Sequence, residues 1–209
     1  MGRKHFRTRL GLAAAAVATL AVASSVSWVN SSAETVRYEV LPGSEVVFES
    51  KAPLESFKGR TDQVSGWFEA DLDNLEGWVA LEVRVDLASF DTGKKKRNEH
   101  MRENHLETDR YPLTVLRGGS VSSVRLIGGR TVMILDGELD LHGVRREVTY
   151  EIALDYKPDG TLVVETDFIV KLSDHEIKRP RFLVMKLADE QKVRVRLTAR
   201  VQGGTEGND

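Results

Sequence analysis

Apolar and polar side chains alternate with a period of two along most of the chain after residue 34. The clearest example is segment 191–201, where basic and hydroxyl side chains separate five apolar ones, Val193, Val195, Leu197, Ala199 and Val201. Successive side chains of a strand point to opposite faces, so this pattern predicts strands with one apolar and one solvated face. The alternation recurs over 79–87, 133–141, 148–155 and 162–172, and in shorter form over 36–40, 46–48 and 64–72.

Short turn sequences separate these predicted strands: Pro42-Gly43, Asn74 to Gly77, Gly118-Gly119, Gly128-Gly129, His142-Gly143 and Pro158 to Gly160. About eight strands joined by short turns predict an antiparallel meander, because parallel strands need long crossover connections. A sheet with one apolar face must pack against a second sheet or close, and closure also removes exposed edges. We therefore expect an all-β, eight-stranded antiparallel barrel over residues 34–202.

Two segments break the alternation. Residues 91–110 are dominated by charged side chains, with only Met101 and Leu106 apolar, which favours a short helical insertion over the barrel rim. Residues 173–189 contain Pro180, which interrupts a strand ladder. Residues 203–209 have no apolar side chain and are expected to form a disordered tail.

The first 33 residues have the organisation of a secretory signal peptide. Four basic residues precede an apolar run that begins at Leu10, and small residues offer cleavage after Ala23 or Ala33. An uncleaved anchor over 10–29 is the alternative, since that stretch is about long enough to span a bilayer, but its distal half is polar. Both interpretations predict a periplasmic or secreted domain; cleavage predicts no stable membrane insertion.

Charge and cysteine content narrow the function classes. The formal net charge is −2, and loss of the four N-terminal basic residues makes it more negative, which argues against a nucleic-acid partner. The absence of cysteine means that the core and the ladder hydrogen bonds must stabilise the fold without disulfides. The pairing of two barrels as a homodimer remains open.

Three segments together resemble the YceI family of bacterial periplasmic proteins: LASFDTGKKKRNEHMRENHLETDRYP (87–112), LDGELDLHGVRREV (135–148) and IVKLSDHEIKRPRFLVMKLADE (169–190). With the opening VRYEVLPGSEVVFES they cover essentially the whole chain after the N-terminal segment. The resemblance implies a lipocalin-like barrel around an elongated apolar tunnel that holds a polyisoprenoid chain, such as a prenyl diphosphate or a quinone tail. It implies no catalytic residues and no cofactor other than such a bound lipid.

One region departs from the family pattern. Members usually carry a histidine after the second strand, whereas residues 50–70 here read SKAPLESFKGRTDQVSGWFEA. The departure bears on the ligand's head group rather than on the barrel.

The interior of an eight-stranded barrel either fills with side chains or admits one thin ligand, and the sequence leaves both open. If it is hollow, the inward faces predict an apolar lining of Phe48, Phe68, Leu81, Val83, Met133, Leu139, Tyr150, Ile152 and Phe168. For a charged head group the candidates are Arg97, Arg102 and Tyr111, because arginine pairs well with a diphosphate. The alternative is that these cations pair with neighbouring glutamates.

The remaining candidates for chemistry are weak. His100 and His105 are five residues apart, which is not the spacing of two metal ligands on one helical face. We interpret His142 as a turn residue and His175 as a solvated loop residue, and we expect no metal site. No nucleophile motif of a hydrolase is present. The sequence thus favours an apolar-lipid-binding protein, with an enzyme acting at the rim or a filled-barrel scaffold as alternatives.

Overall fold

The computed structural model describes residues 35–51, 56–182 and 185–203 of the 209-residue chain. The predicted signal peptide and residues 204–209 of the predicted tail lie outside the described residues. Within these ranges, the helices are all too short or too polar to cross a lipid bilayer.

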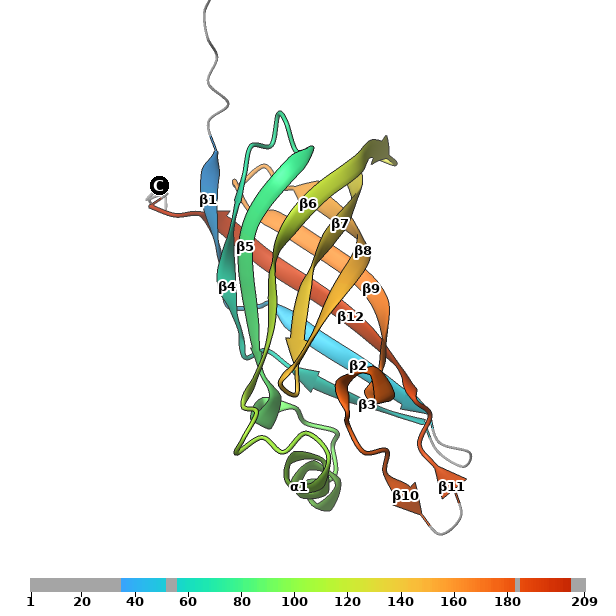
Figure 1. Ribbon diagram of the computed structural model, residues 1–209. Helices are drawn as coiled ribbons and strands as arrows, with labels where there is room; N and C mark the ends of the chain where they lie inside the picture. Colours follow the sequence, from blue (N-terminus) through green and yellow to red (C-terminus); the bar gives the residue numbers. More distant parts are fainter. Residues whose placement is uncertain (1–34, 52–55, 183–184, 204–209) are drawn as a thin grey trace, which may run out of the picture. The chain divides into compact units, whose positions relative to one another are not determined.

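The described residues form a barrel of antiparallel strands with a few short helices (Figure 1). Its strands are β1 (Val36–Val40), β2 (Glu45–Lys51), β3 (Ser56–Thr61), β4 (Val64–Ala70), β5 (Gly77–Asp86), β6 (Leu113–Ile127), β7 (Arg130–Leu141), β8 (Val144–Tyr156), β9 (Leu162–Lys171) and β12 (Glu190–Val201). A separate two-stranded hairpin, β10 (Arg181–Phe182) and β11 (Met185–Lys186), lies between β9 and β12 in sequence.

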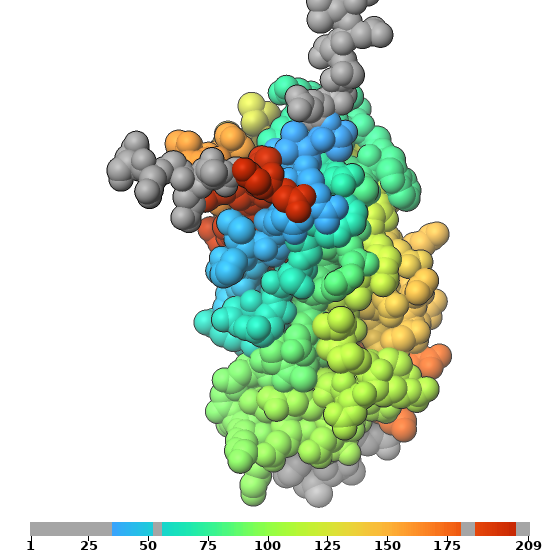
Figure 2. Space-filling view, turned by 90° about the vertical axis from the view of Figure 1, so that its left-hand side faces the viewer, coloured from blue at the N-terminus to red at the C-terminus, as the bar shows by residue number. Residues whose placement is uncertain are grey.

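The ten strands of this sheet occupy eight positions around the barrel, here called staves. Two of the staves each consist of two strands placed end to end. β1 and β2 lie end to end along β12, and β3 and β4 lie end to end along β2 and β1. The order around the barrel is then β1/β2, β3/β4, β5, β6, β7, β8, β9 and β12. Pairing of β1 and β2 with β12 closes the ring, and Figure 2 shows β1 beside the end of β12. The predicted eight-stranded antiparallel barrel is confirmed.

The turn predicted at Pro42-Gly43 is the break between β1 and β2. Val40 pairs with Ala199 and Glu45 with Arg196, so the four residues between Val40 and Glu45 face only two on β12. The extra residues bulge out of the ladder. Ser44 bridges the break, since its hydroxyl accepts a hydrogen bond from the Thr198 N–H at 3.0 Å.

The turn predicted at Gly118-Gly119 is wrong. Both glycines lie inside β6, at an irregularity in its pairing with β5 and β7. A Cβ atom on Gly119 would lie 1.5 Å from the backbone oxygen of Asp136 on β7. These glycines therefore permit a close approach of backbones at a bulge instead of a chain reversal.

The charged insertion forms one helix, α1 (Lys95–Asn104), after the short 3-10 helix η1 (Leu87–Ser89). α1 lies at the same end of the barrel as β10 and β11 (Figure 1). A second 3-10 helix, η2 (Leu172–His175), follows β9. Met101 and Leu106, the two apolar residues of the insertion, pack against the cluster of buried residues that contains Leu87 and Phe90.

The core differs between the two ends of the barrel. At the end away from α1, buried side chains fill the interior, among them Tyr38, Leu162 and Ala199 in one cluster and Met133 and Leu135 in another. Around α1, a further cluster forms from the strands and the two connections that contain η1 and η2. The apolar cavity described below lies at this second end.

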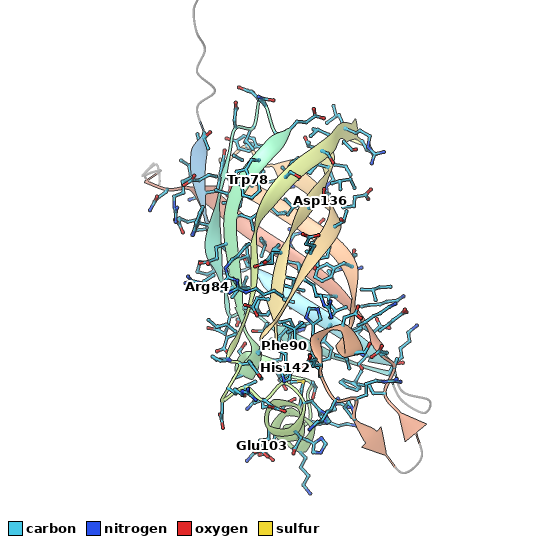
Figure 3. All side chains as sticks on the ribbon, viewed as in Figure 1. Trp78, Arg84, Phe90, Glu103, Asp136 and His142 are labelled. Carbon is cyan, nitrogen blue, oxygen red and sulfur yellow. The ribbon has the colours of Figure 1, made fainter. Side chains whose placement is uncertain are left out.

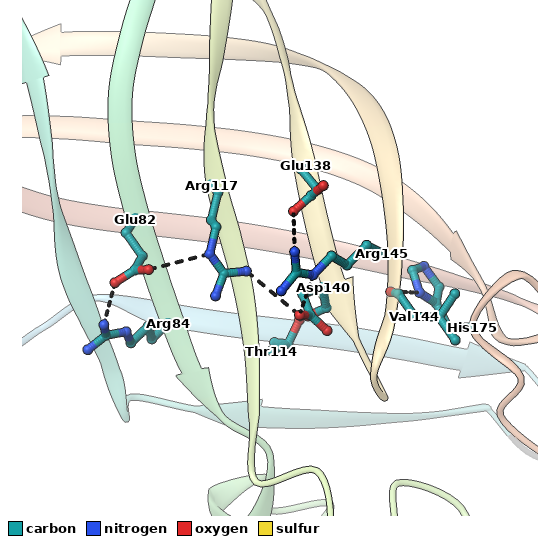
Figure 4. A network of polar contacts seen from close by, with 9 residues as sticks. All are labelled: Glu82, Arg84, Thr114, Arg117, Glu138, Asp140, Val144, Arg145 and His175. Atoms are coloured by element: carbon teal, nitrogen blue, oxygen red, sulfur yellow. Dashed lines mark hydrogen bonds and ion pairs between the residues drawn. The ribbon is translucent and has the colours of Figure 1, made fainter.

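The outer face of the barrel carries ion pairs within and between neighbouring strands. Across β5 to β8, Glu82 contacts Arg84 and Arg117, and Asp140 lies 3.7 Å from Arg117 and 3.3 Å from Arg145 (Figure 4). Such partly exposed pairs each contribute little to stability. Their main effect is to keep the outward face of each strand solvated and so fix its register.

Candidate functional site

The barrel contains an apolar cavity at the α1 end. Its volume is about 330 Å³, and its walls come from β2, β3, β5 to β9 and β12. At the rim lie α1 and residues 172–180, here called the η2 segment. This volume is at the lower end of the range for small-molecule sites, roughly 300–1,000 Å³. The interior is therefore neither filled along its whole length nor open from end to end.

The alternation of the strands produces the apolar wall. On β12, Val193, Val195 and Leu197 line the cavity, while Arg194 and Arg196 between them are exposed. Arg194 pairs with Asp167 on the outer face of β9 at 2.8 Å. Because successive side chains point to opposite faces of the sheet, the inner face is apolar and the outer face is charged.

Aromatic rings gather on two sides of the cavity. The ring of Phe48 lies 6.2 Å from that of Phe57 and 5.3 Å from that of Phe90, both with edge contacts. Gly59 makes room for Phe48, because a Cβ there would lie 2.3 Å from the ring. Tyr150 and Phe168 on neighbouring strands have ring centroids 4.2 Å apart.

Several polar side chains line the cavity but turn their polar atoms to the backbone. The Thr114 hydroxyl donates to the Asp140 carbonyl at 2.9 Å, Thr166 to the Glu151 carbonyl at 2.8 Å, and the Gln191 amide to the Ala188 carbonyl at 2.7 Å. Burial raises the pKa of the Tyr150 phenol, which therefore stays neutral. The wall offers a guest mainly carbon surface.

Arg97 lies at the rim, where a network of hydrogen bonds fixes the start of α1. Its Nε donates to the Thr92 hydroxyl at 2.9 Å and its Nη2 to the Thr92 carbonyl at 2.7 Å. The guanidinium also lies over the Phe57 ring, 4.1 Å from its centroid. Asn98 completes the network by accepting from the Thr92 N–H and donating to Asp91. Hydrogen bonds among Asp91, Thr92, Arg97 and Asn98 therefore attach the start of α1 to the end of the barrel.

Two histidines also line the rim. The Nε2 of His105 lies 3.2 Å from the Nδ1 of His100, and the Nδ1 of His105 lies 2.7 Å from the Lys178 carbonyl. The spacing of five brings the rings together because His105 follows the last residue of α1. Burial, followed by the proximity of His100, lowers the pKa of His105.

His142 and His175 lie at the turn between β7 and β8, where η2 meets it. His142 and Gly143 both have positive φ, 56° and 74°, and form the hairpin turn that the sequence predicts. His142 lies at the end of the barrel that carries α1 (Figure 3). The prediction of a solvated His175 is wrong. Its side chain is buried, with Nδ1 3.3 Å from the Val144 carbonyl, because η2 folds back onto this hairpin.

The structure brings together most of the predicted apolar lining. Six of the nine residues line the cavity: Phe48, Val83, Leu139, Tyr150, Ile152 and Phe168. Phe68, Leu81 and Met133 have the expected inward orientation but lie at the filled end, where they pack in the core. Of the head-group candidates, Arg97 lines the cavity, whereas Arg102 and Tyr111 are not among its lining residues. Tyr111 instead packs against His142, with ring centroids 4.3 Å apart.

Other lining residues were not predicted. Phe57 and Phe90 lie at the ends of segments, where the alternation is too short to assign a face, and Leu172 and Ile177 come from the irregular connection after β9. For Phe57, the polar neighbours Ser56 and Lys58 were the only indication in the sequence that its side chain points inward.

A family model described as the YceI-like domain matches residues 38–199, which is most of the chain and nearly all of the described barrel. The chain belongs to the YceI-like family. The resemblance seen in the sequence is thus confirmed. No curated protein matches this YceI-like chain closely enough to count as a relative.

Solved structures share the fold of this YceI-like protein at low sequence identity. A polyisoprenoid binding domain from Saccharophagus degradans, implicated in plant cell wall breakdown, aligns with a TM-score of 0.64 at 18% identity, covering 80% of this chain and 99% of that one. BcnA of Burkholderia cenocepacia aligns with a TM-score of 0.63 at 20% identity, covering 76% and 98%. The YCEI protein of Campylobacter jejuni gives 0.52 at 16% identity, covering 67% and 82%. These similarities establish the barrel fold.

Proposed function

We propose that this protein binds an isoprenoid or a similar long apolar lipid in the cavity, for sequestration or transport outside the cytoplasm, and does not catalyse a reaction. The observation that carries the proposal is the cavity itself, an apolar pocket of about 330 Å³ at one end of a closed barrel. The similarity to the polyisoprenoid binding domain from Saccharophagus degradans supports the same ligand class.

The physical basis is burial of hydrocarbon. Removing apolar surface from water is favourable by about 25 cal/mol per Å², so a methyl-branched chain gains affinity along its length without a polar contact. Val193, Val195 and Val170 supply a branched aliphatic wall, and the Phe48 and Phe168 rings supply flat surfaces. The polar lining groups that donate to backbone carbonyls are already satisfied and do not compete for the guest.

The polar end of the ligand would lie at the rim, where Arg97 and the two histidines His100 and His105 line the cavity. A cation at this position suits a phosphate or diphosphate head group. The signal-like N-terminal segment and the family's typical location support a periplasmic or secreted protein, in which such a barrel would carry the lipid through water.

The test is direct identification of the guest. The protein is purified from its native host without detergent, extracted with organic solvent and analysed by mass spectrometry. We expect about one isoprenoid or quinone-type molecule per chain. Protein that yields no lipid, and that also fails to take up prenyl alcohols in vitro, would rule out the proposed function.

A further inference from the structure

The cavity has a floor made of two pairs of side chains on opposite walls of the barrel. Val83 on β5 pairs directly with Leu116 on β6, and Val164 on β9 pairs directly with Leu197 on β12. All four line the cavity. In a ring of eight staves, β5 is four positions from β9 and β6 is four positions from β12, so the two pairs face each other across the barrel axis.

The same four residues belong to the packed core at the filled end. Val83, Val164 and Leu197 are buried members of the cluster, and Leu116 packs against it. Directly behind them lie Leu162, which is 1% exposed, and Ala199, which is 0% exposed. The interior is close-packed beyond this point, so a guest cannot pass deeper without displacing side chains.

The strand register sets the depth of the cavity. On β12 the lining runs from Gln191 at the rim to Leu197 at the floor, and on β9 from Val164 to the end of the strand beside Leu172. At about 3.3 Å per residue these spans are roughly 20–26 Å along the strands. A strand tilt of about 40° reduces them to roughly 15–20 Å along the axis.

This depth corresponds to a short isoprenoid. An isoprene unit adds four chain bonds of about 1.5 Å each, or roughly 5 Å of extended length. We infer that the cavity accommodates about three to four isoprene units and that Val83, Leu116, Val164 and Leu197 set this limit on chain length. The inference rests on the proposed function and specifies its ligand as a prenyl chain of about 15–20 carbons. The remainder of a longer chain would project through the rim into water.

The experiment measures displacement of a fluorescent apolar dye by prenyl alcohols of 10, 15, 20 and 40 carbons. Affinity should rise at least about tenfold per added unit up to 15–20 carbons and then level off. Continued growth of affinity to 40 carbons, in proportion to length, would overturn the inference. Failure of every alcohol to displace the dye would instead count against the proposed function.

Substitutions at the floor provide the second part of the test. Leu197→Ala should deepen the cavity and move the affinity plateau to a longer chain. Val164→Phe should make the cavity shallower and weaken binding of the 20-carbon alcohol at least tenfold relative to the 10-carbon one. Leu135→Ala is the matched control, because Leu135 is a buried residue of the filled end that does not line the cavity. Its plateau should stay that of the wild type. Floor variants that fold and retain the wild-type plateau would contradict the inference.

Discussion

The Nδ1 atom of His105 lies 2.7 Å from the backbone oxygen of Lys178 and so joins the end of α1 to the η2 segment across the rim of the cavity. A second contact, between the Nδ1 of His142 and the His175 carbonyl at 3.1 Å, attaches η2 to the β7–β8 hairpin. In each contact the imidazole nitrogen must carry the hydrogen, since a carbonyl only accepts. Neutral imidazoles can therefore donate both of the hydrogen bonds that connect these segments at the rim.

We expect the barrel to lose stability as the pH falls from 7.5 to 5.5. Burial lowers the pKa of His175 and His105 in the folded protein, whereas an unfolded histidine titrates near 6.5. Their stabilisation is therefore complete above about pH 6.5 and is lost as the pH falls below it towards the folded pKa. Asp174 beside His175 opposes the shift, and Arg146 reinforces it.

Thermal unfolding at the two pH values tests this expectation. His175→Asn keeps a donor near the Val144 carbonyl but cannot titrate, so the melting temperature of this variant should depend less on pH than that of the wild type. The pH window lies above the range in which Asp91 and Asp189 titrate, because hydrogen bonds lower the pKa of both carboxyls. An unchanged pH dependence in His175→Asn would show that this histidine is not a source of the loss.

Charge on the inward face should be far more damaging than charge on the outward face. Ile152 lines the cavity and packs against the filled core, whereas the adjacent Glu151 is exposed. Ile152→Lys should cost several kcal/mol or prevent folding, because it buries an unpaired cation. Glu151→Lys should change stability by less than about 1 kcal/mol. Chemical denaturation gives both values, and equal losses would contradict the assigned faces. Leu81→Lys should resemble Ile152→Lys.

Gly119→Ala should be among the most damaging single-atom additions in the barrel. A Cβ at this position would lie 1.5 Å from the Asp136 carbonyl oxygen, which belongs to the backbone and cannot rotate away. We expect a loss of at least about 3 kcal/mol in the free energy of unfolding. Ser120→Ala, at an exposed neighbouring site, is the control and should be nearly neutral. A folded Gly119→Ala protein with wild-type stability would mean that β6 and β7 do not approach as closely as described.

Removal of charge at Arg97 should discriminate between head groups. Arg97→Gln should weaken binding of a prenyl diphosphate more than that of a prenyl alcohol of the same chain length, because only the diphosphate pairs with a cation. Comparison of the two ligands in one variant cancels the structural effect of the lost Thr92 contacts. Arg102→Gln, on the same helix but outside the cavity lining, should affect both ligands little. Equal weakening of both ligands by Arg97→Gln would remove the head-group role.

Most of the fold could be predicted from the sequence because a strand's alternation reports which side chains share a face. The alternation does not report how far along the barrel axis a residue lies. Phe68, Leu81 and Met133 therefore received the correct face but belong to the filled end. The position of a residue along the barrel axis depends on the register and tilt of its strand, and pairing with other strands sets both.

Local composition misled in two further places. Gly118-Gly119 has the composition of a turn, yet it serves a close approach between neighbouring strands. His175 lies between two acids in a polar stretch, but the fold of η2 buries it. In both cases the deciding contact comes from a segment distant in sequence, which composition cannot reveal.

The most direct test of lipid binding in the barrel is a variant that plugs it. Val193 lines the middle of the cavity on β12, and the adjacent Lys192 is exposed on the outer face. Native mass spectrometry should show one prenyl alcohol bound to the wild type and to Lys192→Trp, and none bound to a folded Val193→Trp. Undiminished binding by a folded Val193→Trp would place the ligand elsewhere and contradict the account.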